Sequence, residues 1–189
     1  YMVLTYGNRH GGAAELAAEL CEKCGIWPSY INVLLMVDNW LPSFDMDEQM
    51  KLDKKVEEQL AAIRADIDSR KRGIAKVTDT DRAAHQQFLA GMAKLPADAW
   101  QHLIRVGEGC VGCGICVRVC PSGSIRMEKG RAVHVPGTCE TCLACVHSCP
   151  QKAIGLTVPE KNPSARYRNE HISLKDLVEA NCRTKERGE

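Results

Sequence analysis

Two copies of one cysteine pattern lie between residues 110 and 150. The first reads Cys110-Val-Gly-Cys-Gly-Ile-Cys-Val-Arg-Val-Cys-Pro121, and the second reads Cys139-Glu-Thr-Cys-Leu-Ala-Cys-Val-His-Ser-Cys-Pro150. Each copy spaces its cysteines as C-x2-C-x2-C-x3-C-P, and all four cysteines and the proline recur 29 positions later. An apolar residue recurs at the same offset, as Ile125 and Ile154. The chain therefore contains an internal repeat built around its thiols.

The repeated spacing predicts a metal cluster. Three thiolates with two residues between successive cysteines allow one tight loop to hold three corners of a four-iron cubane. The fourth ligand must come from elsewhere. The spacing resembles that of bacterial-type ferredoxins with two [4Fe-4S] clusters, in which the fourth cysteine of each run ligates the other cluster. We therefore assign Cys110, Cys113, Cys116 and Cys149 to one cluster and Cys139, Cys142, Cys145 and Cys120 to the other.

Two other uses of cysteine fit this pattern less well. A disulfide framework is typical of small secreted domains, and the chain shows no signal peptide. Zinc sites usually take two ligands from each knuckle and not four from one run. Gly112 and Gly114 suit a loop that approaches inorganic sulfur closely with positive φ angles, and its amides are then free to hydrogen-bond to sulfur.

Composition places the chain among intracellular globular proteins. It has 189 residues, eleven cysteines and a formal net charge of +1, with 25 basic and 24 acidic side chains. No basic stripe suggests a nucleic-acid partner, and no apolar run reaches the ~20 residues of a membrane span. We expect a reducing, anaerobic cytoplasm.

The first 75 residues predict part of an α/β domain. Residues 1–6 and 30–37 are apolar enough for buried parallel strands, and residues 13–24 and 47–72 have helical periodicity. Two parallel strands with two helices do not make a complete sheet. We therefore expect an N-terminal half to be removed, disordered or supplied by a partner chain.

The remaining elements divide the chain further. We expect α/β structure at 1–75, a helical linker at 76–100 with a helix at 79–94, a two-[4Fe-4S] ferredoxin domain at 101–160, and a tail at 161–189. We expect this tail to pack back on the α/β part. The predicted strands of the ferredoxin domain are 102–106, 125–127, 132–135 and 154–158, of which 125–127 and 132–135 pair across a Glu128–Lys129–Gly130 turn. In the tail, a capping box at Ser173 and Asp176 predicts a helix at 173–178.

The whole chain resembles the C-terminal two-thirds of the flavodoxin–ferredoxin fusion proteins of anaerobic bacteria and archaea. The resemblance is carried by Leu-Thr-Tyr-Gly before Gly11-Gly12-Ala13, by Val-Asp-Asn-Trp-Leu-Pro at 37–42, by the cysteine runs, and by Asn162-Pro163 with the residues up to Leu177. It implies a partial flavodoxin-like, doubly wound parallel sheet (α/β) followed by a ferredoxin-like α+β module. It also implies that flavin mononucleotide (FMN) is an electron partner when the N-terminal half is present.

The same resemblance places the loop after the first strand beside the flavin ring. Tyr6, Gly7 and Asn8 are then candidate flavin contacts, at the carboxyl end of a strand where open α/β sheets bind ligands. A glycine-rich turn between a strand and a helix is also common scaffolding, and these glycines lack the dinucleotide-binding spacing. Both interpretations remain open at this point.

Four further side chains have both a functional and a structural interpretation. Cys21 and Cys24 form either a redox pair or small buried hydrophobes, and we favour the second. His147 could tune a cluster, but we favour a solvated loop residue, and Trp40 either stacks on a flavin or anchors the fold. Cys182 lies in a polar tail and is interpreted as an incidental thiol.

These patterns predict an iron–sulfur electron carrier rather than a substrate-converting enzyme. No Ser/His/Asp arrangement or pair of carboxylates suggests a catalytic site, so catalytic residues are not assigned. The expected partners are redox proteins, with no nucleic acid and no membrane span. Two alternatives remain: a wiring domain or subunit of a larger flavin-dependent oxidoreductase, and a structural or regulatory iron–sulfur protein.

Overall fold

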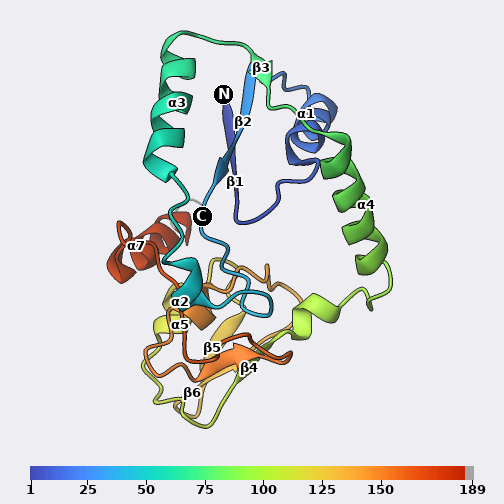
Figure 1. Ribbon diagram of the computed structural model, residues 1–189. Helices are drawn as coiled ribbons and strands as arrows, with labels where there is room; N and C mark the ends of the chain where they lie inside the picture. The colour runs from blue at the N-terminus through green and yellow to red at the C-terminus, as the bar shows by residue number, and fades with distance from the viewer. Residues whose placement is uncertain (186–189) are drawn as a thin grey trace. The chain divides into compact units, whose positions relative to one another are not determined.

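The computed structural model describes the backbone of residues 1–185 and the side chains of residues 1–181. The chain forms two compact units, whose elements are labelled in Figure 1. The first contains residues Tyr1–Asn39 and Gln49–Leu95, and the second contains Trp40–Glu48 and the chain from Pro96 onward. The segment 40–48 therefore leaves the first unit and returns to it.

The first unit is built on a parallel three-stranded sheet of order β1-β2-β3. Strand β1 (Met2–Tyr6) runs beside β2 (Tyr30–Leu35), with Met2 opposite Ile31 and Tyr6 opposite Leu35. The predicted pair of parallel strands is therefore confirmed. The short β3 (Gly73–Ile74) was not predicted, because two residues are too few to show a strand pattern.

Helices α1 (Ala13–Lys23) and α3 (Val56–Asp68) cover opposite faces of this sheet (Figure 1). Successive side chains of a strand point to opposite faces. Accordingly Ile31 packs with Ala14 of α1, whereas Leu34 packs with Ile63 of α3. The two small clusters, one on each face, hold the unit together.

The predicted helix at 47–72 is wrong in its first third. The structure has a single turn, α2 (Met46–Gln49), and then a break before α3. Asp53 Oδ1 accepts the N–H of Lys55 at 2.9 Å, and Lys55 adopts a left-handed backbone with φ of 53°. This local turn competes with the helix, as is common for aspartate. Leu52, which lies in the interrupted part, is exposed.

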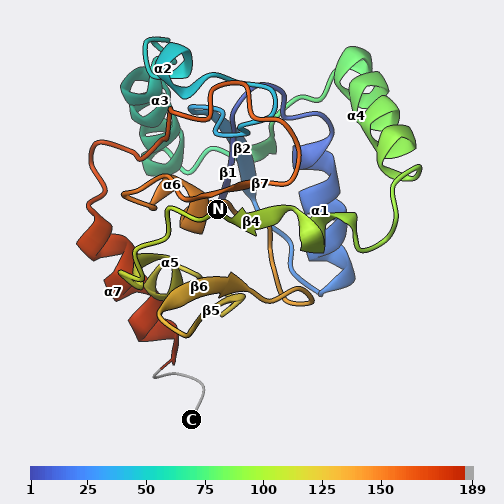
Figure 2. The same ribbon diagram turned by 90° about the horizontal axis from the view of Figure 1, so that it is seen from below.

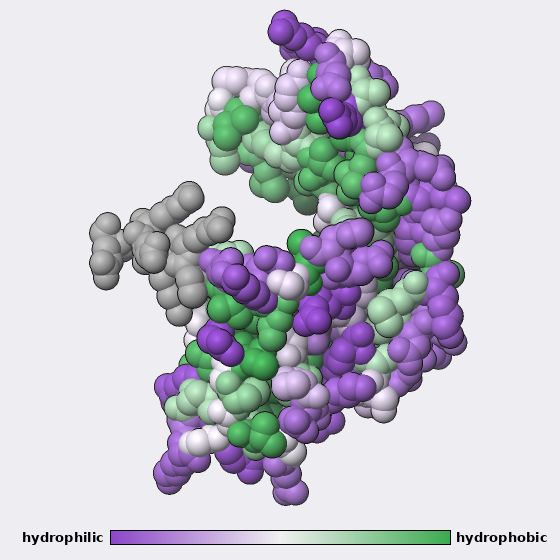
Figure 3. All heavy atoms as spheres, turned by 90° about the vertical axis from the view of Figure 1, so that its left-hand side faces the viewer, coloured by the Kyte–Doolittle hydropathy of each residue, from purple (hydrophilic) through white to green (hydrophobic). Residues whose placement is uncertain are grey.

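Helix α4 (Asp79–Met92) belongs to the first unit, where the prediction had a linker. It begins with a capping box formed by Thr78 and Asp81. Arg82 makes a bidentate ion pair with Glu15 of α1, with nitrogen–oxygen distances of 2.5 and 3.0 Å. None of the α4 side chains is buried, and Phe88 is 60% exposed. Figure 3 draws the opposite side, which carries α3, and hydrophobic residues reach the surface between hydrophilic ones there as well.

The second unit contains two antiparallel strand pairs. Strand β4 (Ile104–Val106), which follows the 3₁₀ turn Ala99–His102, pairs with β7 (Ile154–Leu156). Strands β5 (Ile125–Glu128) and β6 (Arg131–His134) form the predicted hairpin. Its turn residues Lys129 and Gly130 both have positive φ angles, 47° and 78°, as a tight two-residue hairpin requires. Figure 2 shows β7 and the short helix α6 (Ala144–His147) most clearly.

The segment 40–48 is part of the core of the second unit. Leu41 and Met46 are completely buried in one cluster with Ile104 and Ile154. The Lys161 N–H donates to the Leu41 carbonyl at 2.8 Å, so the tail does contact a segment that precedes α3. The tail was predicted to pack on the α/β part, and this contact instead lies within the second unit.

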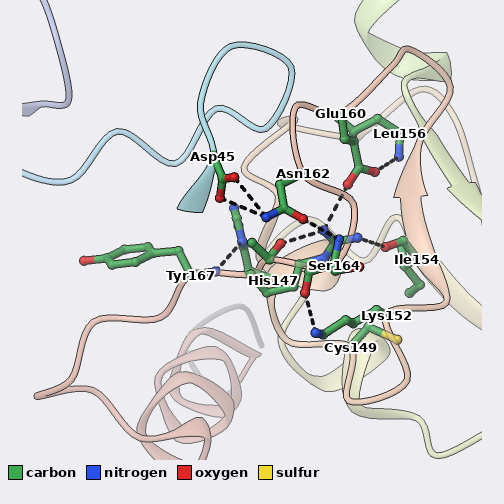
Figure 4. A network of polar contacts seen from close by, with 12 residues as sticks. Asp45, His147, Cys149, Lys152, Ile154, Leu156, Glu160, Asn162, Ser164 and Tyr167 are labelled. Carbon is green, nitrogen blue, oxygen red and sulfur yellow. Dashed lines mark hydrogen bonds and ion pairs between the residues drawn. The ribbon is translucent and has the colours of Figure 1, made fainter. Parts of the chain in front are cut away.

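Polar contacts fix the first part of the tail (Figure 4). Asn162 donates to both carboxylate oxygens of Asp45, each at 3.0 Å. Glu160 and Arg166 form an ion pair of 2.9 Å whose side chains are 4% and 9% exposed. Glu160 also accepts the Leu156 N–H, and Arg166 donates to the Ile154 carbonyl. The tail thereby holds both ends of β7.

The last helix, α7 (Leu174–Lys185), begins at the predicted capping box. Ser173 Oγ accepts the Asp176 N–H at 3.1 Å, and Asp176 accepts the Ser173 N–H at 2.8 Å. The helix extends beyond its predicted end at residue 178. Within residues 1–185, no helix combines the length and the apolar character needed to cross a bilayer.

Candidate iron–sulfur centre

The two cysteine runs adopt the same backbone structure. Each begins as an irregular loop and ends in one helical turn, α5 (Ile115–Arg118) in the first run and α6 (Ala144–His147) in the second. These turns lie 29 positions apart, as the cysteines do. The repeat read from the sequence is therefore also a repeat of conformation.

Left-handed residues recur at the same offset. In the first run they are Gly112, Gly114 and Gly123, with φ angles of 70°, 71° and 68°. In the second run the matching residues are Thr141, Leu143 and Lys152, with φ angles of 52°, 59° and 50°. Left-handed backbone is unusual for residues other than glycine and is retained where the surroundings require it. Both loops thus keep one path in spite of different side chains.

Close packing explains one of these glycines. A Cβ atom added to Gly112 would stand 2.2 Å from the carbonyl oxygen of Gly130, whereas one added to Gly114 would meet nothing within 4 Å. The loop of the first run therefore passes directly against the β5–β6 turn. Glycine is needed at 112 for space, and at 114 only for its backbone angle.

Two cavities separate the eight cysteines into two sets of four. The first cavity is lined by Cys110, Cys113, Cys116 and Cys149. The second is lined by Cys139, Cys142, Cys145 and Cys120. Each cavity thus combines three cysteines of one run with the fourth cysteine of the other. In the described part of the chain, no three His, Cys, Asp or Glu side chains converge on a single-ion site.

Backbone amides point at three of the thiols. The Ser124 N–H donates to Cys120 Sγ at 3.2 Å, and the Ala153 N–H donates to Cys149 Sγ at 3.3 Å. These two bonds occupy equivalent positions of the repeat. A third bond joins the Ala132 N–H to Cys110 Sγ at 3.4 Å. Such bonds stabilise negative charge on sulfur.

The environments of the thiols differ with their burial. Burial raises the pKa of the Cys145 thiol to about 12, and burial also raises the pKa of Cys116. The pKa of Cys110 is lowered, because the N–H groups of Ala132 and Gly112 stabilise its thiolate. A metal ligand must be deprotonated, so binding of a cluster at Cys116 and Cys145 has to release protons.

The second cavity has polar side chains that the sequence analysis did not single out. Ser122, Ser124, His134 and Glu140 line it. Ser122 Oγ lies 3.6 Å from Cys120 Sγ and 2.9 Å from Ser124 Oγ, which in turn lies 2.9 Å from Thr138 Oγ1. The position of Ser122 directly after Cys-Pro was the available signal, whereas His134 reaches the cavity only through the β5–β6 pairing.

His147 and Trp40 have structural contacts. His147 Nδ1 accepts the Tyr167 N–H at 3.0 Å, and its ring meets the Tyr167 ring edge-on with centroids 6.5 Å apart. The prediction of a solvated loop histidine was therefore wrong. Trp40 packs edge-on against Trp100, with centroids 5.7 Å apart, beside the core of the second unit. This contact favours the anchoring role.

Cys21 and Cys24 belong to the first unit and line neither of the two cavities. Cys24 is exposed and Cys21 is half-buried, so the description of both as buried hydrophobes was wrong. Cys24 follows the last residue of α1, and its N–H donates to the Cys21 carbonyl at 3.0 Å. None of the ten cysteines whose side chains the structure describes forms a disulfide. The side chain of Cys182 lies outside the described residues.

The candidate flavin contacts lie at the end of β1: Tyr6 is its last residue, and Gly7 and Asn8 follow it. Gly7 has a packing role, because a Cβ atom there would stand 2.4 Å from the Cα atom of Asp38. Its carbonyl accepts from Lys54 Nζ at 3.2 Å. The Tyr6 ring meets the His10 ring edge-on with centroids 5.2 Å apart, and Asn8 is exposed. The carboxyl ends of β1 and β2 lie at the same edge of the sheet.

Comparison with known proteins identifies the second unit's chemistry. Residues 102–171 match the family described as 4Fe-4S dicluster domain. Over 48 residues the chain is 48% identical to one of the subunits of an ion-translocating oxidoreductase complex from Methanosarcina acetivorans. That match covers 25% of this chain and 18% of the relative, so the chain spans less than a fifth of the relative's length. Residues 102–171 therefore match a ferredoxin domain of the 4Fe-4S dicluster type, a kind of domain typical of iron–sulfur electron transfer.

Proposed function

We propose that this protein carries electrons at low potential through two [4Fe-4S] clusters. The proposed ligands are Cys110, Cys113, Cys116 and Cys149 for the first cluster and Cys139, Cys142, Cys145 and Cys120 for the second. The observation that carries this proposal is the composition of the cavities, each of which joins three cysteines of one run to the last cysteine of the other. Crossed ligation of this kind is typical of ferredoxins with two cubane clusters.

A bound cubane cluster supplies one-electron redox chemistry, and the protein determines how easily that electron is held. The N–H groups of Ser124 and Ala153 stabilise the thiolates of Cys120 and Cys149. Cys116 and Cys145, one from each run, are close enough for their charges to interact. The two proposed clusters are therefore neighbours, which favours electron exchange between them.

The direct test is the composition of protein purified without oxygen. It should contain about eight irons and about eight acid-labile sulfides, as two four-iron clusters require. A broad absorption near ~400 nm should bleach on addition of dithionite, as expected of reducible cubane clusters. Stoichiometric zinc without sulfide would contradict the proposal. Because exposed clusters are oxygen-sensitive, the proposed compartment is a reducing cytoplasm.

We further propose FMN as an electron partner, with its ring at the loop that contains Tyr6, Gly7 and Asn8. Two observations support this site: the loop follows the carboxyl end of a strand in a parallel sheet, and His10 Nδ1 is buried without a hydrogen-bond partner among the described residues. The intact arrangement would be flavodoxin-like, with the remaining strands in a preceding segment or a partner chain.

The flavin proposal depends on a phosphate clamp. FMN needs backbone amides at a helix N-terminus for its phosphate, and in the flavodoxin–ferredoxin fusions that loop follows an earlier strand. Residues 1–189 alone should therefore lose flavin during gel filtration, whereas a longer chain with that strand and loop should retain it. The flavin retained by each of the two chains is measured by releasing it with acid and recording its fluorescence. Equimolar flavin on the short chain, or none on the long one, would contradict the proposal.

A second candidate function is that of a wiring component within a larger oxidoreductase. It is favoured by the relative in Methanosarcina acetivorans, whose name describes one of the subunits of an ion-translocating oxidoreductase complex. Co-purification of the native protein with a stoichiometric redox partner would support this function over that of a free carrier. Potentiometry separates both from a structural or regulatory role, because an electron carrier must reduce and reoxidise reversibly.

A further inference from the structure

The β5–β6 hairpin contributes one cross-strand pair to each cavity. Met127 and Ala132 face each other across the strands and both line the first cavity. Ile125 and His134 face each other two residues further along and both line the second cavity. The two pairs are on the same face of the hairpin, because side chains of a strand alternate with a period of two. One imidazole therefore distinguishes the second cavity from the first.

His134 has a buried nitrogen without a partner. Its Nε2 atom is inaccessible to solvent and makes no hydrogen bond with any residue in the described part of the chain. A buried polar group is normally paired, since leaving it unpaired costs free energy comparable to a lost hydrogen bond. The remaining lining of this cavity includes four thiols, whose sulfur atoms accept hydrogen bonds when they are deprotonated.

We propose that His134 donates an Nε2–H hydrogen bond to the iron–sulfur cluster held by Cys139, Cys142, Cys145 and Cys120. This inference rests on the proposed function, and it adds a residue that sets the electron affinity of one cluster. The sulfur atoms are acceptors only, which selects the tautomer with its hydrogen on Nε2. Burial lowers the pKa of His134, which favours the neutral ring.

The hydrogen bond should raise the reduction potential of the second cluster. Reduction adds one negative charge, and a donor aimed at sulfur stabilises the reduced state more than the oxidised one. Glu140 lines the same cavity, and its negative charge acts in the opposite direction. Close to the first cavity, the Arg131 charge favours the thiolate of Cys110. The effect of His134 is therefore measured as the change in the reduction potential of the second cluster between wild type and variant. The difference in potential between the two clusters does not isolate it.

Redox titration of the holoprotein, followed by electron paramagnetic resonance, tests the proposal. In His134→Phe, the reduction equilibrium of one cluster should shift about tenfold toward the oxidised form, a potential lower by about 59 mV for one electron. The other cluster should be unchanged. His134→Gln, which keeps an N–H donor, should restore most of the shift. His171→Phe replaces an exposed histidine of the same unit and should have no effect.

The outcomes separate this inference from the proposed function. Protein without iron and sulfide would refute the function itself. Two intact clusters with unchanged potentials in His134→Phe, or equal shifts of both, would refute only the role of His134. If His134→Phe does not assemble its clusters, pulsed electron paramagnetic resonance on the reduced wild-type protein with ¹⁵N-labelled histidine tests the hydrogen bond instead. A nitrogen coupling that is lost in His134→Gln supports the hydrogen bond, and its absence in the wild type contradicts it.

Discussion

The two cysteine runs share a backbone and differ in what surrounds it. The first has glycine at all three left-handed positions, and the second has Thr141, Leu143 and Lys152. The cavity of the first run has mostly apolar walls, whereas that of the second includes two serines, a histidine and a glutamate. The shared cysteine spacing therefore determines the backbone conformation of both runs. The residues packed around each run determine which side chains that backbone can carry.

The difference also separates two reasons for a glycine. At position 112 the neighbouring Gly130 carbonyl excludes any side chain, and at 114 there is open space. The second run accepts Leu143 at the position that matches 114, with its side chain buried in the core. Left-handed conformation alone is thus tolerated when packing compensates for it. The predictions below test how far the equivalence of the two runs extends.

Removal of iron should have the largest effect and should act on one unit. Cys116, Cys120 and Cys145 are buried in the core of the second unit, so loss of the clusters removes part of that core. Metal-binding free energy is also folding free energy in small metal domains. Chelation under reducing conditions should remove hydrogen-exchange protection from β4–β7, while β1 and β2 keep theirs. Equal loss in both units would contradict this separation.

The strands that follow Cys149 and Cys120, the fourth cysteines of the two runs, should contribute differently to the free energy of unfolding. The strand after Cys149 is held by the buried Glu160–Arg166 pair, so Arg166→Met leaves a carboxylate that is 4% exposed without its partner. We expect a loss of ~3–5 kcal/mol in the free energy of unfolding. The control is Arg126→Met, which removes an ion pair 63% and 45% exposed and should cost about 0–1 kcal/mol.

Anaerobic urea unfolding of the holoprotein measures the free energy of unfolding of both arginine variants.

The strand after Cys120 is instead linked through the hydroxyls of Ser124 and Thr138, which are 2.9 Å apart. Ser124→Ala should cost about 0.5–1.5 kcal/mol, the net value of a lost hydrogen bond, because its partners Ser122 and Thr138 are half-buried and exposed and keep access to water. An exposed-pair variant as damaging as Arg166→Met would contradict the structural ranking.

The smallest expected difference is between two alanine substitutions in one loop. Both Gly114→Ala and Gly112→Ala place a side chain in left-handed backbone, which costs roughly 1–2 kcal/mol. Only Gly112→Ala also drives a Cβ atom against the Gly130 carbonyl. Gly114→Ala should retain its iron, whereas Gly112→Ala should lose iron from one cluster. Iron analysis of the two purified variants is the measurement, and equal iron contents would contradict the close approach.

The sequence predicted the parts of the molecule that depend on local patterns. The cysteine spacing indicated which four cysteines share each cavity, and the Glu128–Lys129–Gly130 turn indicated the hairpin. The capping box at Ser173 and Asp176 located the start of α7. In each case a short run of residues has one favourable geometry, so no information from distant parts of the chain was needed.

Features that depend on long-range packing were missed. The break before α3 arises from Asp53 and Lys55, whose turn interrupts an otherwise helical pattern. The segment 40–48 packs with strands more than 55 positions later, which no periodicity reveals. His134 is an ordinary strand residue in the sequence and becomes a cavity residue only through its pairing with Ile125.

The central claim is the crossed ligation, and one set of serine variants tests it most directly. Cys113→Ser and Cys142→Ser define the spectra of protein damaged at the first and at the second cluster. The reduced spectrum of Cys149→Ser should match that of Cys113→Ser, and Cys120→Ser should match Cys142→Ser. Cys21→Ser, Cys24→Ser and Cys182→Ser should leave both clusters intact. If Cys149→Ser instead matches Cys142→Ser, each run holds its own cluster and the crossed assignment is wrong.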